Sequence, residues 1–394
     1  MIHTDIRPTV QEPVGLYLHI PFCRSKCPFC DFCSFPHPAP ETVEAYLVEL
    51  IRRVREAGAT EAAIGGGEPA CLDTVYIGGG TPTLLSPAQA TRLMAAVREA
   101  FAVLPDAEIT VEGNPAALTA EGLYAYRAGG VNRLSLGVQS AHERELKALG
   151  RLHSFSDARE AVKLARSVGI DNINLDFMLG IPGQTPDSLR ATLEAALELS
   201  PEHLSAYCLS IEPGTPFAKR GRAALGLPAD EEEAAEAVSR LYELSERLLT
   251  AAGYEHYEIS NYARPGKRSR HNLHTWQDRC YIGLGVGAYS YMHGVRAGQS
   301  RDLAAFIAGQ DITVDRSVLT PDEVREEYIM LALRLSDGLS ETDYAARFGE
   351  DFFPPRAETC SRLIAAGLAR RQDHRLSLTE AGWLVSNAII AELI

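Results

Sequence analysis

Short apolar runs alternate along the first two thirds of the chain with longer segments in which apolar residues recur every three or four positions. The short runs predict strands and the longer segments predict amphipathic helices. The predicted strands are 16–20, 74–78, 108–112, 133–138, 172–178 and 203–210. The predicted helices are 41–57, 87–101, 119–128, 155–168, 186–199 and 230–252. This order predicts an α/β fold, a partial (β/α)6 barrel rather than a closed eight-stranded one.

Polar motifs lie on or just after the predicted strands, and nearly every one follows its strand directly, at the ends where such barrels bind ligands. They are the glycine motif "GGGTPT" at 78–83, Glu112 in "EGNP", Gln139 in "GVQS", Arg151 and His153 in "GRLH", and Asp176 in "NLDF". Each has an ordinary structural explanation alone, such as a strand-end turn or a salt bridge. Their places on successive strands favour one shared site. Asp176 lies within an apolar strand and needs a partner, for which Arg151 is the candidate.

Glycine-rich segments allow the backbone to approach a ligand closely, but they also form plain turns. "GGGEP" at 65–69 resembles the motif at 78–81, yet it follows a segment with little strand character. We therefore favour 78–81 as the binding motif and expect 65–72 to be an inserted surface loop. Gly283, Gly285 and Gly287 alternate in "YIGLGVGAYSY", which fits either an approach to a nucleoside or a packed strand.

Net charge and composition indicate which classes of partner are not expected. The 394 residues carry a formal net charge of -14, with 46% hydrophobic and 23% charged residues, so a nucleic-acid backbone is not expected as a partner. No apolar run is long enough to span a membrane, and the first residues lack the pattern of a secretory signal. We expect a cytoplasmic protein, in which clustered thiols stay reduced.

Four of the 8 cysteines stand together in "CRSKCPFCDFC", at positions 23, 27, 30 and 33. Three interpretations compete: disulfides, a tetrahedral zinc site and an iron–sulfur cluster. The compartment argues against disulfides, and zinc sites usually draw their ligands from two separated pairs. The spacing C-x3-C-x2-C of Cys23, Cys27 and Cys30 suits a cluster with three thiolate ligands and one open iron. The remaining cysteines are expected to be small buried hydrophobic residues: Cys71, Cys208, Cys280 and Cys360.

The chain changes character near residue 319, where helical segments and a short strand follow one another in the order of a winged helix. Residues 320–394 hold 13 acidic and 8 basic residues, which does not fit phosphate binding. We expect a lid over the barrel mouth or a module that docks a partner. The predicted domains are an N-terminal segment (1–14), a barrel with its extension (15–318) and a C-terminal helical module (319–394).

The three-cysteine spacing after the strand in "GLYLHIPFC" resembles the signature of radical S-adenosylmethionine (radical SAM) proteins. With the strand-end motifs, the chain resembles the coproporphyrinogen dehydrogenase (HemN) class of that superfamily and, most closely, the HemW-type heme chaperones. The resemblance implies that Cys23, Cys27 and Cys30 ligate a 4Fe-4S cluster. It also implies that S-adenosylmethionine chelates the fourth iron and yields a 5′-deoxyadenosyl radical when reduced.

The same resemblance implies roles for the residues of the strand-end motifs. Tyr17 and Phe29 match residues that line the adenosyl site, and Gly79, Gly80, Thr81 and Glu112 match residues around the first S-adenosylmethionine. Gln139, Arg151 and Asp176 match contacts to a second S-adenosylmethionine in the oxidases of the class. Whether one or two molecules bind stays open.

Two features favour the chaperones over the oxidases. The oxidases have a fourth cysteine two residues after the third, where this chain has Phe32, and they have a longer arm before the cluster. The segment "SRHNLHTW" resembles the H-N-x-x-Y-W motif of the chaperones, with Thr275 in place of the tyrosine. His271 is the candidate heme ligand and Trp276 a candidate to stack on the porphyrin, although a histidine in an ordinary turn is the alternative.

Two functional classes therefore stay open. One is heme binding and transfer, with S-adenosylmethionine, heme or porphyrin, an electron donor and a heme-acceptor protein as partners. The other is catalysis, either the oxygen-independent oxidation of coproporphyrinogen III or radical methyl transfer by a HemN-like enzyme.

Overall fold

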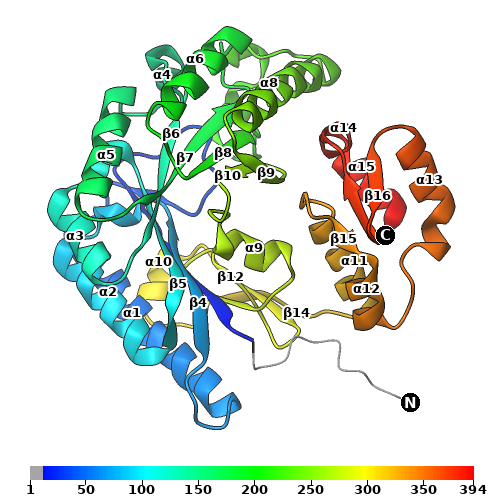
Figure 1. Ribbon diagram of the computed structural model, residues 1–394. Helices are drawn as coiled ribbons and strands as arrows, with labels where there is room; N and C mark the ends of the chain where they lie inside the picture. The colour runs from blue at the N-terminus through cyan, green and yellow to red at the C-terminus, as the bar shows by residue number, and fades with distance from the viewer. Residues whose placement is uncertain (1–11) are drawn as a thin grey trace.

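A single mixed sheet of twelve strands organises the computed structural model, which describes residues 12–394 (Figure 1). Its centre is a run of parallel strands: β1 (Val14–Ile20), β4 (Cys71–Gly79), β5 (Ala102–Gly113), β6 (Arg133–Gln139), β7 (Asn172–Leu179) and β8 (His203–Cys208). Helices cover their outer face: α1 (Pro40–Ile64), α2 (Pro87–Ala100), α3 (Ala120–Ala128), α5 (Phe155–Ser167), α6 (Pro186–Leu197) and α8 (Glu231–Ala251). The partial (β/α)6 barrel is confirmed.

Local signals explain where the helices begin. Ser86, Ser154 and Thr185 each cap a helix through a reciprocal capping box at the starts of α2, α5 and α6. The prediction was wrong at the end of α1, which continues to Ile64, and at residues 71 and 72, which begin β4. The loop before them, which contains "GGGEP", is largely exposed, as expected for a surface loop.

The two faces of each central strand carry different residues. On β6 the positions Leu134, Leu136 and Val138 are fully buried in the hydrophobic core beneath the helices. The positions between them, Arg133, Ser135, Gly137 and Gln139, line the barrel interior. The same alternation occurs on β7, so the barrel encloses a polar space rather than a packed apolar core.

Antiparallel strands extend the sheet at both edges. Beside β1, the parallel strand β11 (Tyr281–Leu284) leads to β12 (Tyr289–Met292), β13 (Val295–Gln299) and β14 (Thr313–Val318). Beside β8, the hairpin of β9 (Glu255–Glu258) and β10 (Asn261–Ala263) completes the other edge. The remaining elements of this part are β2 (Phe22–Cys23), β3 (Phe35–Pro36), α4 (Glu143–Ala148), α7 (Pro216–Arg220) and α10 (Leu303–Ile307).

Helix α9 (Arg270–Trp276) closes the end of the barrel where the parallel strands begin. The His271 amide donates to Glu108, and the Arg270 guanidinium donates to the carbonyl of Asp106, both near the middle of β5. The Thr74 hydroxyl near the start of β4 lies 3.0 Å from Nδ1 of His271. The polar interior is thereby closed at this end and opens at the other.

The C-terminal module has its own hydrophobic core, which runs from Ile329 to Leu393. It consists of α11 (Pro321–Ala332), β15 (Leu339–Ser340), α12 (Glu341–Phe348), α13 (Ala357–Ala365), β16 (Ala369–Gln372), β17 (Arg375–Leu378), α14 (Glu380–Leu384) and α15 (Ser386–Leu393). Its three-stranded sheet has the order β15-β17-β16, which fits the expected winged-helix-like order. In the described part of the chain, no helix is long and apolar enough to cross a membrane.

The module packs beside the open edge of the barrel rather than over its mouth (Figure 1). Leu335 forms an isolated β-bridge with Glu258 of the edge strand β9, and Arg347 forms an ion pair with the buried Asp278 at 2.6 Å. Trp276 lies beneath the Arg334 guanidinium, 6.0 Å from it. The expectation of a lid over the mouth was wrong, because no residue of 319–394 lines the pocket described next.

Candidate functional site

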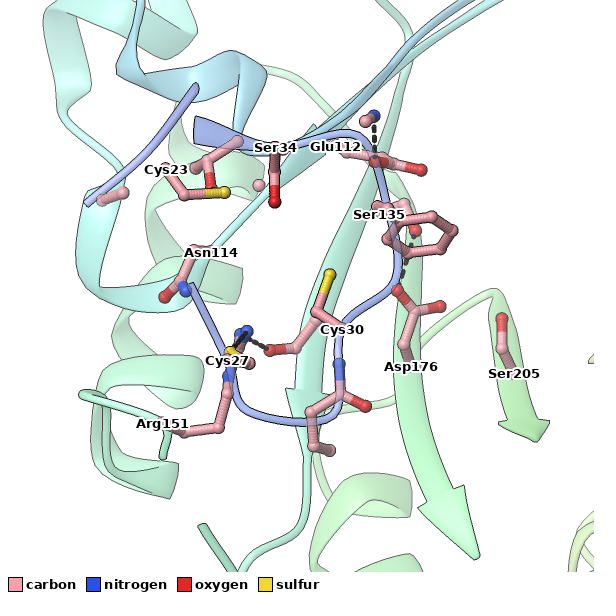
Figure 2. A pocket seen from close by; sticks show the side chains of 18 of the residues that line it. Cys23, Cys27, Cys30, Ser34, Glu112, Asn114, Ser135, Arg151, Asp176 and Ser205 are labelled. Carbon is pink, nitrogen blue, oxygen red and sulfur yellow. Dashed lines mark hydrogen bonds between the residues drawn. The ribbon is translucent and has the colours of Figure 1, made fainter. Parts of the chain in front are cut away.

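A pocket of about 540 Å³ opens where the parallel strands end and continues into the polar interior of the barrel (Figure 2). Its walls contain most of the residues selected from the sequence: Cys23, Cys27, Phe29, Cys30, Gly79, Gly80, Thr81, Glu112, Gln139, Arg151 and Asp176. Tyr17 and His271 do not line it. The strand-end motifs therefore meet in one cavity whose volume suits a small organic ligand.

The cysteine loop crosses the pocket between β2 and β3, which pair in parallel and hold its two ends together. The Cys30 amide donates to the Cys27 carbonyl, which places the last two cysteines of the motif on one tight turn. The Thr81 hydroxyl lies 3.6 Å from Cys23 Sγ, and an Arg151 N–H lies 3.7 Å from Cys27 Sγ. These donors suit thiolates better than neutral thiols.

The donor set fits an iron–sulfur cluster better than a single ion. Within residues 12–394, no three histidine, cysteine or acidic side chains converge closely enough to hold one metal ion. A tetrahedral zinc site needs that convergence, whereas a cluster takes one thiolate at each of several irons. Burial raises the pKa of Cys23 and Cys30, so the binding of a cluster by their thiolates must release protons.

Cys33 lies apart from the other three cysteines of the motif. It is only 7% exposed, belongs to the hydrophobic core and does not line the pocket. Its carbonyl lies 2.7 Å from Nε2 of His19, which fixes the end of the loop.

The prediction for the remaining cysteines was wrong in part, because Cys71 and Cys208 are exposed.

Glu112 is held by two donors at the end of β5. The Tyr76 hydroxyl donates to Oε1 at 2.8 Å, and the Gly79 amide donates to Oε2 at 2.9 Å. Burial and the nearby Asp176 raise the pKa of Glu112 to about 7, against the opposing effect of its donors. The carboxyl group can therefore gain or lose a proton near neutral pH.

The glycines of the motif at 78–81 allow close packing within the protein. A Cβ on Gly79 would lie 2.5 Å from the His19 ring, and one on Gly80 would lie 2.6 Å from the Phe22 carbonyl oxygen. Gly79 has a φ of 113°, which directs its amide towards Glu112. These glycines thus join the cysteine loop to the strand end that carries Glu112.

The expected pairing of Asp176 with Arg151 was wrong. Asn174 donates to Oδ1 of Asp176 at 2.7 Å, and Ser135 donates to Oδ2 at 3.4 Å. The reason is the register of β6 and β7, which places Ser135 opposite Asn174 and both close to Asp176. Arg151 instead donates to the Gly137 carbonyl and approaches Cys27, so it supports the cysteine loop.

Gln139 ends β6 with a φ of 72°, an unusual value for a residue with a side chain. Its side-chain oxygen accepts a 2.6 Å hydrogen bond from Tyr207 on β8. Across the mouth, Phe29 packs near Phe217 at a ring distance of 6.3 Å. Contacts with β8 and with the segment that follows it therefore hold Gln139 and Phe29 in place.

His271 lies behind an aromatic layer at the closed end of the barrel. Its ring stacks on Tyr76 at 5.1 Å and on Tyr17 at 6.4 Å. Burial lowers the pKa of His271 to about 3. A second histidine of α9, His274, is fully buried, and its Nε2 lies 2.6 Å from Asp73, so this nitrogen is already engaged.

Gly283, Gly285 and Gly287 do not line the pocket, so their expected approach to a nucleoside was wrong. A Cβ on Gly283 would meet the Tyr289 carbonyl oxygen, and one on Gly285 would lie 2.5 Å from the Tyr46 hydroxyl. These glycines serve the close packing of strands, which was the other interpretation of the segment.

Several pocket residues lie deeper than the strand ends, and the sequence reasoning did not select them. They are Tyr76, Arg133, Ser135, Asn174, Ser205 and Tyr207 on the strands, with Asn272 on α9. The signal was present in the alternation "RLSLGVQ" on β6 and "NINLD" on β7, where every second residue is polar or glycine. Strict alternation in a strand predicts that one face is solvated or binds a ligand.

Comparison with protein families and curated proteins gives matches along the whole chain. Residues 70–196 match the radical SAM superfamily, and residues 319–385 match the HemN C-terminal domain. The chain is 37% identical to the heme chaperone HemW of Escherichia coli, over 96% of this chain and 97% of that protein. It is 35% identical to the heme chaperone HemW of Bacillus subtilis, over 96% and 98% of the two chains.

Among solved structures, the fold matches the Escherichia coli coproporphyrinogen III oxidase HemN, a radical SAM enzyme. The TM-score is 0.81 over 98% of this chain and 91% of that chain, at 23% sequence identity. At this identity the match concerns the fold, including the C-terminal module.

Proposed function

The chain belongs to the HemW family of heme chaperones within the radical SAM superfamily, and on this premise we propose that it binds heme, a 4Fe-4S cluster and S-adenosylmethionine. The observation that carries the proposal is the full-length similarity to HemW proteins, together with a pocket lined by all three cysteines of the C-x3-C-x2-C spacing. A reduced cluster of this kind supplies an electron to a bound sulfonium.

The pocket residues support a division of roles. We propose that Cys23, Cys27 and Cys30 hold the cluster and that Arg151 and Thr81 stabilise two of these thiolates by hydrogen bonds. S-adenosylmethionine would lie between the cysteine loop and Glu112, whose carboxylate accepts from an ammonium or a ribose hydroxyl. Phe29, Gly79, Gly80, Gln139 and Asp176 line the same space. Tyr17 lies outside the pocket and stacks on Tyr76, which lines it.

We propose His271 as the protein ligand of heme iron. Its low pKa keeps the imidazole neutral across the physiological range, and only a neutral imidazole binds iron. Because Tyr17 and Tyr76 cover the ring, ligation requires α9 to move away from β1 and β4. Trp276 lies on the same helix, where Arg334 of the C-terminal module covers it, so heme access to Trp276 also requires movement there.

The proposal extends to partners, location and domains. The cluster requires an electron donor, and heme delivery requires an acceptor protein. We propose a cytoplasmic location, because all eight cysteines are free thiols. We also propose that the chain divides near residue 319, where the separate core of the module supports a boundary. Of the proposed segment 1–14, residues 1–11 lie outside the described residues.

Oxidation of coproporphyrinogen III, the activity named for the HemN structure, is the alternative function. Phe32 stands in place of the fourth cysteine of the oxidases and is 68% exposed at the pocket mouth. That departure favours the chaperone. Radical methyl transfer has no separate observation in its favour.

The proposal is tested with protein reconstituted anaerobically with iron and sulfide. Heme titration should give a saturable Soret band, and His271→Ala should shift or abolish that band while retaining the cluster. Because the pKa of His271 is about 3, heme binding through this ligand should not weaken between pH 8 and pH 5. Incubation with coproporphyrinogen III, S-adenosylmethionine and a reductant should release no carbon dioxide. Conversion to protoporphyrinogen IX would establish the oxidase instead.

Glu112→Gln should weaken S-adenosylmethionine binding by about 1–3 kcal/mol, the cost of losing a charge-assisted hydrogen bond. Because the pKa of Glu112 is about 7, the wild-type carboxyl is increasingly protonated as the pH falls from 8 to 6. Wild-type affinity should therefore fall over this range, whereas the affinity of Glu112→Gln should stay flat. Calorimetry on reconstituted protein measures both.

Glu145→Gln is the matched control, because Glu145 is a buried carboxylate outside the pocket that accepts from Ser140 and Ser188. This variant should keep the wild-type pH dependence. Wild-type affinity and pH dependence in Glu112→Gln would remove Glu112 from the S-adenosylmethionine site.

A further inference from the structure

Arg133 is a cation at the deep end of the pocket, and residues 12–394 provide no ion-pair partner for it. It is the first residue of β6, is only 2% exposed, and is one of the largest fully buried side chains. Its Nε is sealed from solvent and has no hydrogen-bond partner among the described residues. Between residues 12 and 394, no carboxylate forms an ion pair with its guanidinium, although the side chain lines the pocket. Guanidinium groups do not lose their proton in proteins, so this charge requires a counter-ion.

The two carboxylates that line the pocket, those of Glu112 and Asp176, do not supply that counter-ion. Glu112 is held by Tyr76 and Gly79, and Asp176 is held by Asn174 and Ser135. Both lie close enough for the charge of Arg133 to lower their pKa, but burial outweighs that effect and the pKa of each is raised. The donors of Arg133 thus stay available to an acceptor that enters the pocket.

Strand register places Arg133 at the end of the pocket away from the cysteines. It pairs with Thr110, which pairs with Tyr76, whereas Glu112 lies opposite Ser135, further along the strands. Gly137, whose carbonyl contacts the arginine beside Cys27, is four residues beyond Arg133, or about 13 Å along the strand. A group bound by Arg133 therefore belongs to a different part of a ligand from a group bound near the cysteines.

We propose that Arg133 forms an anion subsite at the closed end of the barrel and binds a carboxylate of the pocket's ligand. A planar guanidinium matches a carboxylate with two parallel hydrogen bonds. A single negative charge fits this end better than a phosphate dianion, because the other cations that line the pocket, Arg24, Lys26 and Arg151, belong to the cysteine loop or contact it. The subsite rests on the proposed function for its ligand, heme, which carries two propionates; the carboxylate of S-adenosylmethionine is expected at the open iron, beside the cysteines.

The test compares heme with a form that lacks free carboxylates. Wild type and Arg133→Met are titrated with heme and with heme dimethyl ester. Heme should bind wild type about 10- to 100-fold more tightly than the ester. That preference should vanish in Arg133→Met, whose side chain has similar length without charge. The affinity for S-adenosylmethionine should be the same in both proteins.

Three outcomes separate the possibilities. An acid preference that persists in Arg133→Met, or no preference in wild type, overturns the subsite while the proposed function stands. Wild type that binds no heme overturns the proposed function and the subsite together. If Arg133→Met does not fold, Arg133→Gln takes its place, and the acid preference remains the measurement because a purely structural role would not alter it.

Discussion

Replacing Cys27 with alanine is expected to abolish assembly of the iron–sulfur cluster. The variants Cys23→Ala and Cys30→Ala should do the same, because each of the three thiols lines the pocket and would ligate a different iron. Iron and acid-labile sulfide, measured after anaerobic reconstitution, should fall from a full complement to near zero. The visible absorption of the cluster should disappear with them.

Cys33→Ala is the matched control within the same loop. Cys33 is buried in the core and faces away from the pocket, with Gly287 beside its Cβ. This variant should retain the full iron and sulfide content, with a modest loss of stability from a small cavity. If Cys33→Ala loses iron as completely as Cys27→Ala, the assignment of three ligands and an open iron is wrong.

Gly80→Ala is expected to destabilise the fold by about 3 kcal/mol, the upper end of the usual cost of overpacking. The added Cβ would lie 2.6 Å from the Phe22 carbonyl oxygen and 3.0 Å from Cys23 Sγ. Because the first of these atoms belongs to the backbone, relief requires the strand that carries Cys23 to shift. The variant should therefore unfold at lower urea concentration and also bind less iron.

Gly65→Ala provides the comparison, since it adds the same methyl group in the exposed loop after α1. Its nearest neighbour would be at 3.3 Å, and its φ of -78° is open to alanine. Stability should change by less than about 1 kcal/mol, and iron content should not change. Equal stability of the Gly80→Ala and wild-type proteins would show that the contact between the glycine motif and the cysteine loop is not tight.

The sequence allowed close prediction of the elements that local patterns define. Short apolar runs located the central strands, and apolar residues recurring every three or four positions located α2, α5 and α6. The end of α1 was missed, because its apolar pattern fades before the glycines at 65–67 that stop the helix. Local signals thus place an element more securely than they place its last turn.

The contacts of the site depended on register and distant packing, which local patterns do not contain. Asp176 lies within β7, and the donors that reach it are Asn174 on its own strand and Ser135, two residues before the position opposite it on β6. Arg151, which follows α4, is not among them. His271 lies against Thr74, 197 positions away in the chain. Predicting that contact requires the packing of α9 onto the sheet, which depends on the completed barrel.

The alternation along β6 and β7 has a consequence for how this protein tolerates change. Leu134, Leu136 and Val138 hold the wall of the barrel against its helices, while Arg133, Ser135 and Gln139 meet whatever the barrel encloses. The residues that stabilise the fold and the residues that contact a ligand therefore lie on opposite faces of the same strands. Substitutions of interior-facing residues should change ligand preference with little loss of stability, provided that the outward-facing residues are kept.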